Sequence, residues 1–347
     1  MFPRTDQNLV EPTSWKDWES LIYAMVDHYK QRSGAGWYWE VGNEWDLDDG
    51  GGTPYHMTPQ QYTRFYEHTV TAIRRADSEA RVGGAGLAYY TSPILPALLS
   101  FCDKNNVPLD FVSWHGYQSD PRWYRKSIDY VHEQLRPYSR LHPEVVIDEW
   151  NIPLGQAEVD PRLQPVFIAE TTFQMLEGGI DLACYFHIRD YPFEAKAFAK
   201  FFAPQLAAAQ ERFWESHSVY LGLFDAQNHV RPSYFVFRLL ERLTGERVAL
   251  TSSSDTVHGL ATIDDPLGVS SILVWNYSDK ASDVSVRLHN LSANVTAWPY
   301  RLDATGPSDD DMARLRPQPT QRLSKGDGNL SFHLEPWGIT MISLEKD

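Results

Sequence analysis

The stretch WYWEVGNE, residues 37–44, is an apolar, strand-like run that ends in a glutamate. A glycine-rich loop, DLDDGGGTP (46–54), separates it from TPQQYTRFYEHTVTAIRRAD (58–77), whose apolar residues recur at helical spacing. Thr58 suits the cap of this helix, and Pro59 suits its first turn because proline loses no hydrogen bond there. Together these segments predict one strand–helix unit of a parallel α/β fold.

The same alternation continues along the chain. A helix capped by Ser14 precedes the first strand. Further strands are predicted at 81–88, 110–117, 144–151 and 181–188, and further helices at 93–105, 122–136, 164–178 and 232–245. Five strand–helix units predict a (β/α)8 TIM-barrel-type domain that is incomplete, because an eight-stranded barrel needs three more strands. An open parallel sheet is the alternative.

The pattern changes after Gly245. Short alternating runs such as VSSILVWNY and GITMISLE are separated by Asp, Gly, Pro and Asn, as in a compact all-β sandwich. The sequence therefore predicts two domains, a catalytic barrel portion over 1–247 and a β-sandwich over 248–347.

Composition excludes several classes of partner. A formal charge of −15 argues against nucleic acid and against an anionic membrane surface, and no apolar run approaches a membrane span. No signal peptide is visible, which favours the cytoplasm by default. The two cysteines, Cys102 and Cys184, lie in apolar runs and are predicted to be buried thiols, and no Cys/His spacing indicates a metal site. We expect no cofactor.

Glu44 and Glu149 are the candidate catalytic residues. Each ends an apolar strand, where parallel α/β folds gather their active sites, and each is followed directly by a tryptophan. A single glutamate after a strand is more often a solvated end residue, but two in equivalent positions favour a function. Hydrolysis of a glycosidic bond requires two carboxyl groups of unequal proton affinity. We therefore expect a carbohydrate substrate.

Other side chains are predicted to surround this pair. Asn43 can bind the sugar hydroxyl next to the anomeric carbon, and Tyr117 can donate to the nucleophile. His115 shares a strand face with Tyr117, so it can orient a carboxylate or bind substrate. Trp150, which directly follows Glu149, is also predicted to bind substrate. Strict alternation points Asp148 away from Glu149, which predicts a structural role for it.

Phe186 and His187 end the last strand of the series, where an aromatic platform for a sugar ring is expected. Both are predicted substrate-binding residues, although Phe186 suits a core position equally well.

These motifs resemble family 39 of the glycoside hydrolases, the group of β-xylosidases and α-L-iduronidases. The resemblance rests on WYWEVGNEW (37–45), DFVSWHGY (110–117), VVIDEWN (145–151) and GLFDAQNHVRPSYFVFRLL (222–240). It implies a retaining barrel glycosidase with Glu44 as general acid/base on the fourth strand and Glu149 as nucleophile on the seventh. A β-sandwich after the barrel also fits.

The expected activity is hydrolysis of O-glycosyl bonds in β-glycosides by double displacement, with xylan 1,4-β-xylosidase as the specific expectation. The resemblance also implies that strands one to three, with an arginine that supports the nucleophile, are not supplied by this sequence. Either a preceding segment or another chain, such as a second copy, completes the barrel, or the site is open. The alternative function is a non-catalytic or partner-completed carbohydrate-binding relative.

Overall fold

The computed structural model describes residues 11–47, 56–153, 162–190, 196, 211, 221–303 and 315–347. The chain forms two compact units. The first comprises Met1–Trp150 and Met175–Tyr185, and the second comprises Asn151–Gln174 and Phe186–Asp347. The predicted division at 247/248 stays a prediction. In the part of the chain that is described, none of the helices combines the length and the apolarity needed to cross a membrane.

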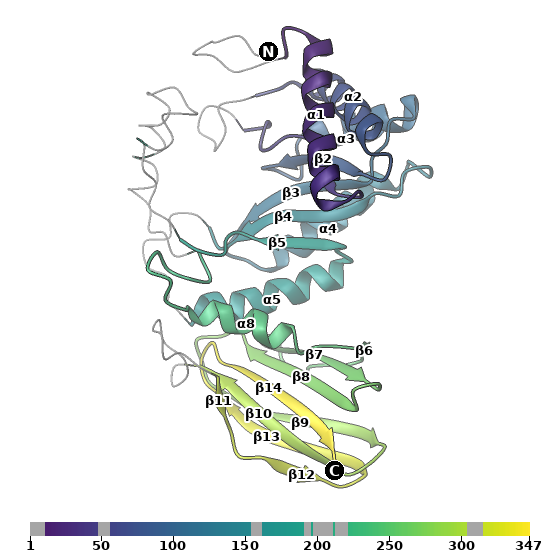
Figure 1. Ribbon diagram of the computed structural model, residues 1–347. Coiled ribbons are helices and arrows are strands. Elements are labelled where there is room, and N and C mark those ends of the chain that lie inside the picture. Colours follow the sequence, from purple (N-terminus) through teal and green to yellow (C-terminus); the bar gives the residue numbers. More distant parts are fainter. Residues whose placement is uncertain are drawn as a thin grey trace. The chain divides into compact units, whose positions relative to one another are not determined.

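The first unit is built on a parallel sheet of the five predicted strands, arranged in chain order (Figure 1). The strands are β1 (Tyr38–Glu40), β2 (Arg81–Leu87), β3 (Phe111–Tyr117), β4 (Glu144–Asn151) and β5 (Leu182–Tyr185). The central strands β2 and β3 are buried almost throughout, as expected for a parallel sheet covered on both faces. This is the incomplete TIM-barrel-type fold that the sequence predicts.

Helices connect consecutive strands of this sheet. They are α2 (Pro59–Ala76), α3 (Ile94–Asn105), α4 (Arg122–Leu135) and α5 (Leu163–Gly178), and α1 (Trp15–Ser33) precedes β1. The predicted caps are confirmed. The Ser14 side chain accepts from Asp17 N, and Thr58 forms a reciprocal capping box with Gln61.

Two strands are shorter than predicted. The run 37–44 forms a ladder only over Tyr38–Glu40, because Gly42 and Glu44 both have positive φ. The chain still follows β2 beyond that point, with Val41 N donating to Gly83 O at 2.9 Å. The run 181–188 forms β5 only over Leu182–Tyr185.

The prediction for the cysteines is half right. Cys102 is buried in α3, whereas Cys184 is exposed. The reason is that β5 lies at the edge of the described sheet, where it pairs only with β4, so its side chains are only partly covered.

The second unit contains α8 (Pro232–Leu240) and the predicted β-sandwich. One sheet has the order β11-β10-β14-β8-β7-β6, with β12 also on β10, and the other pairs β13 with β9. Their bounds are β6 (Glu246–Val248), β7 (Val257–Asp264), β8 (Val269–Asn276), β9 (Ser282–Leu291), β10 (Val295–Leu302), β11 (Arg316–Pro317), β12 (Gln321–Leu323), β13 (Gly326–Leu334) and β14 (Ile339–Lys346). Apolar side chains of both sheets form one core, including Val274, Val286, Leu330 and Ile342.

Candidate active site

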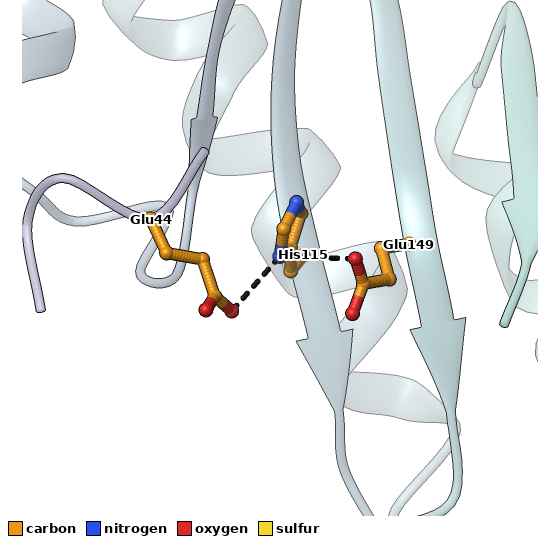
Figure 2. Close-up of side chains that lie close together, drawn as sticks. All are labelled: Glu44, His115 and Glu149. Carbon is orange, nitrogen blue, oxygen red and sulfur yellow. Dashed lines mark hydrogen bonds and ion pairs between the residues drawn. The ribbon is translucent and has the colours of Figure 1, made fainter. Parts of the chain in front are cut away.

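Glu44 lies just beyond β1 in an uncommon backbone conformation. Its φ is +53°, in the left-handed region that few residues other than glycine adopt. Its N–H donates to Gly86 O at 2.7 Å, which ties this turn to the carboxyl end of β2. Strained backbone of this kind clusters at functional sites. The turn directs the Glu44 carboxylate toward β3 (Figure 2).

β4 carries one extra residue at the point where it brings Glu149 to the site. Ile147 pairs with Ala183 and Trp150 pairs with Tyr185, so three steps along β4 match two along β5. This is a β-bulge, and a bulge re-aims the side chains at its position.

The bulge overturns the prediction for Asp148. Strict alternation places Asp148 and Glu149 on opposite faces, but both lie within 4 Å of the His115 ring. Asp148 is therefore part of the site's charge cluster.

His115 joins the two candidate catalytic residues. Its Nδ1 lies 3.0 Å from Glu44 Oε1 and 3.8 Å from Glu149 Oε2 (Figure 2). Its Nε2 lies 3.6 Å from Asp148 Oδ2, an ion-pair distance. The His115 side chain is only 2% exposed. Both ring nitrogens face carboxylate oxygens, which favours the doubly protonated imidazolium.

Electrostatics agree with this protonation state. Burial alone would lower the pKa of His115, but Asp148, Glu44 and Glu149 more than offset it and raise the pKa to about 11. At neutral pH the ring is a buried cation between carboxylates.

Tyr117 makes the contact predicted for it. It follows His115 by two residues on β3, and its hydroxyl donates to Glu149 Oε1. Burial and the neighbouring Glu149 hold the pKa of Tyr117 far above its usual value, so the phenol remains a donor. Burial also raises the pKa of Glu149, while His115 and Tyr117 act in the opposite direction. The net shift is upward, against the expectation of an easily ionised nucleophile, although both contacts favour the ionised form of Glu149.

Two carboxylates thus converge on one imidazole. One oxygen of Glu44, one of Glu149 and a ring nitrogen of His115 lie within 4.8 Å of one another. Within the described residues this is the grouping with metal-ligand spacing. A metal ion would have to displace the ring proton, because imidazole binds metals in its neutral form. The donor set therefore suits proton chemistry better than metal binding.

The remaining predicted residues are not gathered as tightly. Asn43 is exposed next to Glu44, which leaves its predicted role open. Trp150 is only 2% exposed and meets Tyr124 and Tyr185 edge-on, at 6.0 and 5.1 Å between ring centroids. This burial favours a packing role for Trp150 over a sugar platform.

Phe186 and His187 belong to the second unit, whereas Glu44 and Glu149 belong to the first. The two rings stack at 4.6 Å, and His187 Nε2 lies 3.2 Å from Asp190 Oδ1. Sugar binding by these two residues stays a prediction.

Sequence reasoning missed Glu40 and Ser113. Ser113 Oγ donates to Glu40 Oε1, which joins β3 to β1. A signal was present in the sequence, because Glu40 interrupts the apolar run WYWEV.

Comparisons of the sequence and of the fold find similar proteins. A "Beta-xylosidase" of Caldicellulosiruptor saccharolyticus is 26% identical over 261 residues, which is 70% of this chain but 49% of that protein. A glucosidase structure from Croceicoccus marinus aligns with all of this chain and 77% of its own, at a TM-score of 0.76 and 19% identity. A GH39 β-xylosidase structure from Caulobacter crescentus aligns with 99% of this chain and 76% of its own, at a TM-score of 0.72 and 19% identity.

The chain therefore spans about half the length of that curated relative. At 19% identity the two structures show the shared fold and no more. The family match itself covers residues 4–289, which include both glutamates and every strand of the parallel sheet. By its sequence, this chain belongs to glycosyl hydrolase family 39.

Proposed function

We propose that the chain carries the catalytic pair of a retaining glycoside hydrolase that acts on β-glycosides, with β-xylosides as the preferred substrates. Glu149 is the nucleophile and Glu44 the general acid/base. The observation that carries this proposal is the approach of the two carboxylates to within 4.8 Å around His115.

The separation favours retention of configuration. Retaining glycosidases hold their carboxyl groups about 5–5.5 Å apart, whereas inverting enzymes leave about 6.5–9.5 Å for a water molecule. Oxygens of Glu44 and Glu149 within 4.8 Å suit direct attack on the anomeric carbon better than attack by an intervening water.

The contacts support the division of roles. In the first step Glu149 attacks the anomeric carbon, and Glu44 donates its proton to the leaving oxygen. In the second step Glu44 takes a proton from water, and the oxygen of that water displaces Glu149. Tyr117 donates to Glu149 and the His115 cation lies 3.8 Å from it, so both favour the ionised nucleophile.

The names of the relatives support the proposed substrate class. The curated sequence relative is named a β-xylosidase, which favours β-xylosides, and one structural neighbour is named a glucosidase, which makes β-glucosides the natural comparison. A panel of aryl β-glycosides, with product configuration followed by NMR, tests both sugar and stereochemistry. We expect β-xylose as the first product. Formation of α-xylose would contradict retention.

Variants of the two glutamates test their roles. Glu149→Ala is expected to lose at least ~10³-fold in rate, because the covalent route disappears. Glu44→Ala is expected to retain activity on aryl glycosides with good leaving groups and to form a β-glycosyl azide when azide is added. A β-azide from Glu149→Ala, with none from Glu44→Ala, would reverse the assignment.

A second candidate is a partner-completed relative. Leu21, Met25 and Tyr29 of α1 and Trp37 next to β1 are 39–49% exposed in the described chain. Exposed apolar side chains that lie close together indicate a surface that another segment covers. On this proposal, further chain beside β1 is needed before sugars are hydrolysed, and the isolated chain binds sugars without cleaving them.

A further inference from the structure

The segment that follows β2 carries an exposed tyrosine next to the turn of Glu44. Tyr89 lies two residues beyond Leu87, the last residue of β2, at the carboxyl end where parallel α/β folds gather their active sites. It is 57% exposed. A single exposed aromatic side chain is common on protein surfaces, so the meaning of Tyr89 depends on how and where its backbone is held.

Three hydrogen bonds join this segment to the turn that carries the candidate acid/base. Glu44 N donates to Gly86 O at 2.7 Å. The Asp46 carboxylate accepts from Ala88 N at 2.9 Å through Oδ1 and from Tyr89 N at 3.1 Å through Oδ2. Because Asp46 binds two neighbouring N–H groups two residues after Glu44, it fixes the backbone of Tyr89 relative to the candidate acid/base.

The backbone of Tyr89 is held on its other side as well. Ser92 N donates to Tyr89 O at 2.9 Å, which closes a turn. The next ring, Tyr90, packs edge-on against Trp123 and Tyr130 of α4, with 5.2 Å between ring centroids in both pairs. Tyr89 therefore combines a fixed backbone with an exposed ring. Such a preorganised ring loses little freedom when a ligand binds, which suits a binding surface.

The position of the general acid determines which part of a substrate can meet this ring. A general acid donates its proton to the glycosidic oxygen, and the leaving group is attached to that same oxygen. The nucleophile, Glu149 in the proposed mechanism, attacks the anomeric carbon of the sugar that stays behind. An aromatic side chain anchored to the Glu44 turn is therefore placed for the leaving group, and its flat face suits an aryl or pyranose ring.

We propose that Tyr89 is an aromatic platform on which the ring of the leaving group stacks, and that Asp46 positions it. This inference rests on the proposed function and adds a binding residue for the leaving group. The ligand class is a β-glycoside whose leaving group contains an aryl or pyranose ring. Tyr89 contacts the substrate, whereas Asp46 acts through the backbone of Tyr89.

The first test measures binding by isothermal titration calorimetry of thioglycosides, in which sulfur replaces the glycosidic oxygen and slows cleavage. Phenyl 1-thio-β-xyloside carries a ring in place of the leaving group, and methyl 1-thio-β-xyloside carries none. The two corresponding β-glucosides are measured beside them. The wild type should bind the phenyl analogue more tightly than the methyl analogue. Tyr89→Ala should lower this ratio of affinities about 3- to 10-fold, as expected for one lost aromatic contact.

Three further variants separate the ring from its surroundings. Tyr89→Phe should keep the ratio, because it keeps the ring. Asp46→Ala should lower the ratio although the ring is still present, because Tyr89 N loses its acceptor. Tyr23→Ala is the matched control, since Tyr23 is an exposed tyrosine of α1 in the same unit, and it should leave the ratio unchanged.

The outcomes that contradict the proposal are specific. A wild type without preference for the phenyl analogue, an unchanged ratio in Tyr89→Ala, or an equal loss in Tyr23→Ala would overturn the platform. An unchanged ratio in Asp46→Ala would overturn the positioning role of Asp46.

The second test compares kcat/KM for p-nitrophenyl β-xyloside and for β-xylosyl fluoride, whose leaving group has no ring. Tyr89→Ala should lower kcat/KM about 3- to 10-fold for the aryl substrate and leave the fluoride unaffected. The rate at which water releases the glycosyl-enzyme should also stay constant, because the leaving group has departed by then. Equal losses on both substrates would indicate a displaced Glu44 turn and contradict the platform.

The binding measurement does not require turnover. A chain that binds the phenyl analogues through Tyr89 without hydrolysing glycosides disproves the proposed function and keeps the platform. A chain that hydrolyses glycosides with no dependence on Tyr89 disproves the platform alone. If none of the four analogues binds the wild type, Tyr89 is not a platform for β-glycosides.

Discussion

The Tyr117 hydroxyl donates a hydrogen bond to Oε1 of Glu149, the carboxylate that also lies 3.8 Å from the His115 ring. The two contacts oppose the burial that raises the pKa of Glu149. Because the Tyr117 hydroxyl favours the ionised form of Glu149, its removal should change both the pKa of Glu149 and the rate of catalysis.

Tyr117→Phe should raise the pKa of Glu149 further, because a donor to its ionised form is lost. The acid limb of kcat/KM against pH is expected to move to higher pH. A hydrogen bond to a charged group contributes about 1.5–3 kcal/mol, so kcat/KM should fall about 10- to 100-fold at neutral pH. Steady-state kinetics across pH measure both effects.

Tyr66→Phe is the control for this variant. Tyr66 is also buried in the first unit, and its hydroxyl donates to Pro108 O at 2.9 Å, away from the glutamates. Its pH profile should match the wild type. Equal shifts in both variants would assign the effect to general loosening of the unit.

Gly86 supports the strained turn at Glu44. It accepts from Glu44 N, its φ is +55°, and a Cβ added there would lie 3.2 Å from Gly42 O. Gly86→Ala should lose about 1 kcal/mol in unfolding free energy from the left-handed backbone. It should also lower kcat about 10- to 100-fold, because small displacements of a catalytic group are costly.

Gly268→Ala separates the two effects. Gly268 has φ +67°, and a Cβ added there would meet nothing within 4 Å. This variant should lose similar stability and keep full kcat. If Gly86→Ala also kept full kcat, the contact of this turn with β2 would not determine the position of the Glu44 carboxylate.

Periodicity and turn chemistry were enough to predict the five parallel strands and the caps. The alternation of strands and helices indicates a parallel sheet, which the structure contains, and Ser14 and Thr58 cap their helices as expected. These features depend on neighbours within a few residues, so the local sequence carries their signal.

The details of the site depended on contacts that the sequence does not display. The bulge between Ile147 and Trp150 appears only in the pairing with β5, and it brings Asp148 to His115. The hydrogen bond from Ser113 to Glu40 likewise joins residues that are 73 positions apart along the chain. A period-2 rule cannot include an inserted residue, so Asp148 was assigned to the wrong face.

Glu170 makes the stability of the second unit depend on pH. This buried carboxylate accepts from Trp275 Nε1 at 2.8 Å and lies 2.7 Å from His258 Nδ1. Burial alone would raise the pKa of Glu170, but hydrogen bonds from His258, Gln174 and Trp275 lower it. The hydrogen bond to Glu170 raises the pKa of His258.

The two shifts predict a stability maximum. The Glu170 contribution is present above its unfolded pKa of 4.5 and is lost as the pH falls through its lower folded value. The His258 contribution is complete below 6.5 and is lost as the pH rises through its higher folded value. The pair therefore stabilises the unit most between about pH 4.5 and 6.5.

His258→Gln tests this maximum, because glutamine can still donate to Glu170 without carrying a charge. Denaturation at several pH values should show that the variant loses the decline on the alkaline side that His258 causes. If the stability of the wild type and of the variant changes with pH in the same way from pH 6 to 9, the coupling between His258 and Glu170 is contradicted.

The exposed apolar side chains of α1 predict association. Leu21 is 41% exposed and Tyr29 is 49% exposed, and both lie on the helix that precedes the β1 edge. We expect the isolated chain to self-associate through this surface, and Leu21→Glu/Tyr29→Glu to reduce its sedimentation coefficient toward that of the monomer. The stability of the folded unit should change by less than about 0.5 kcal/mol, because the substituted side chains are exposed. Leu267 is an exposed residue between β7 and β8, away from α1 in the sequence, and Leu267→Glu should leave association unchanged. If the wild type is a monomer, a second copy of the chain does not cover α1.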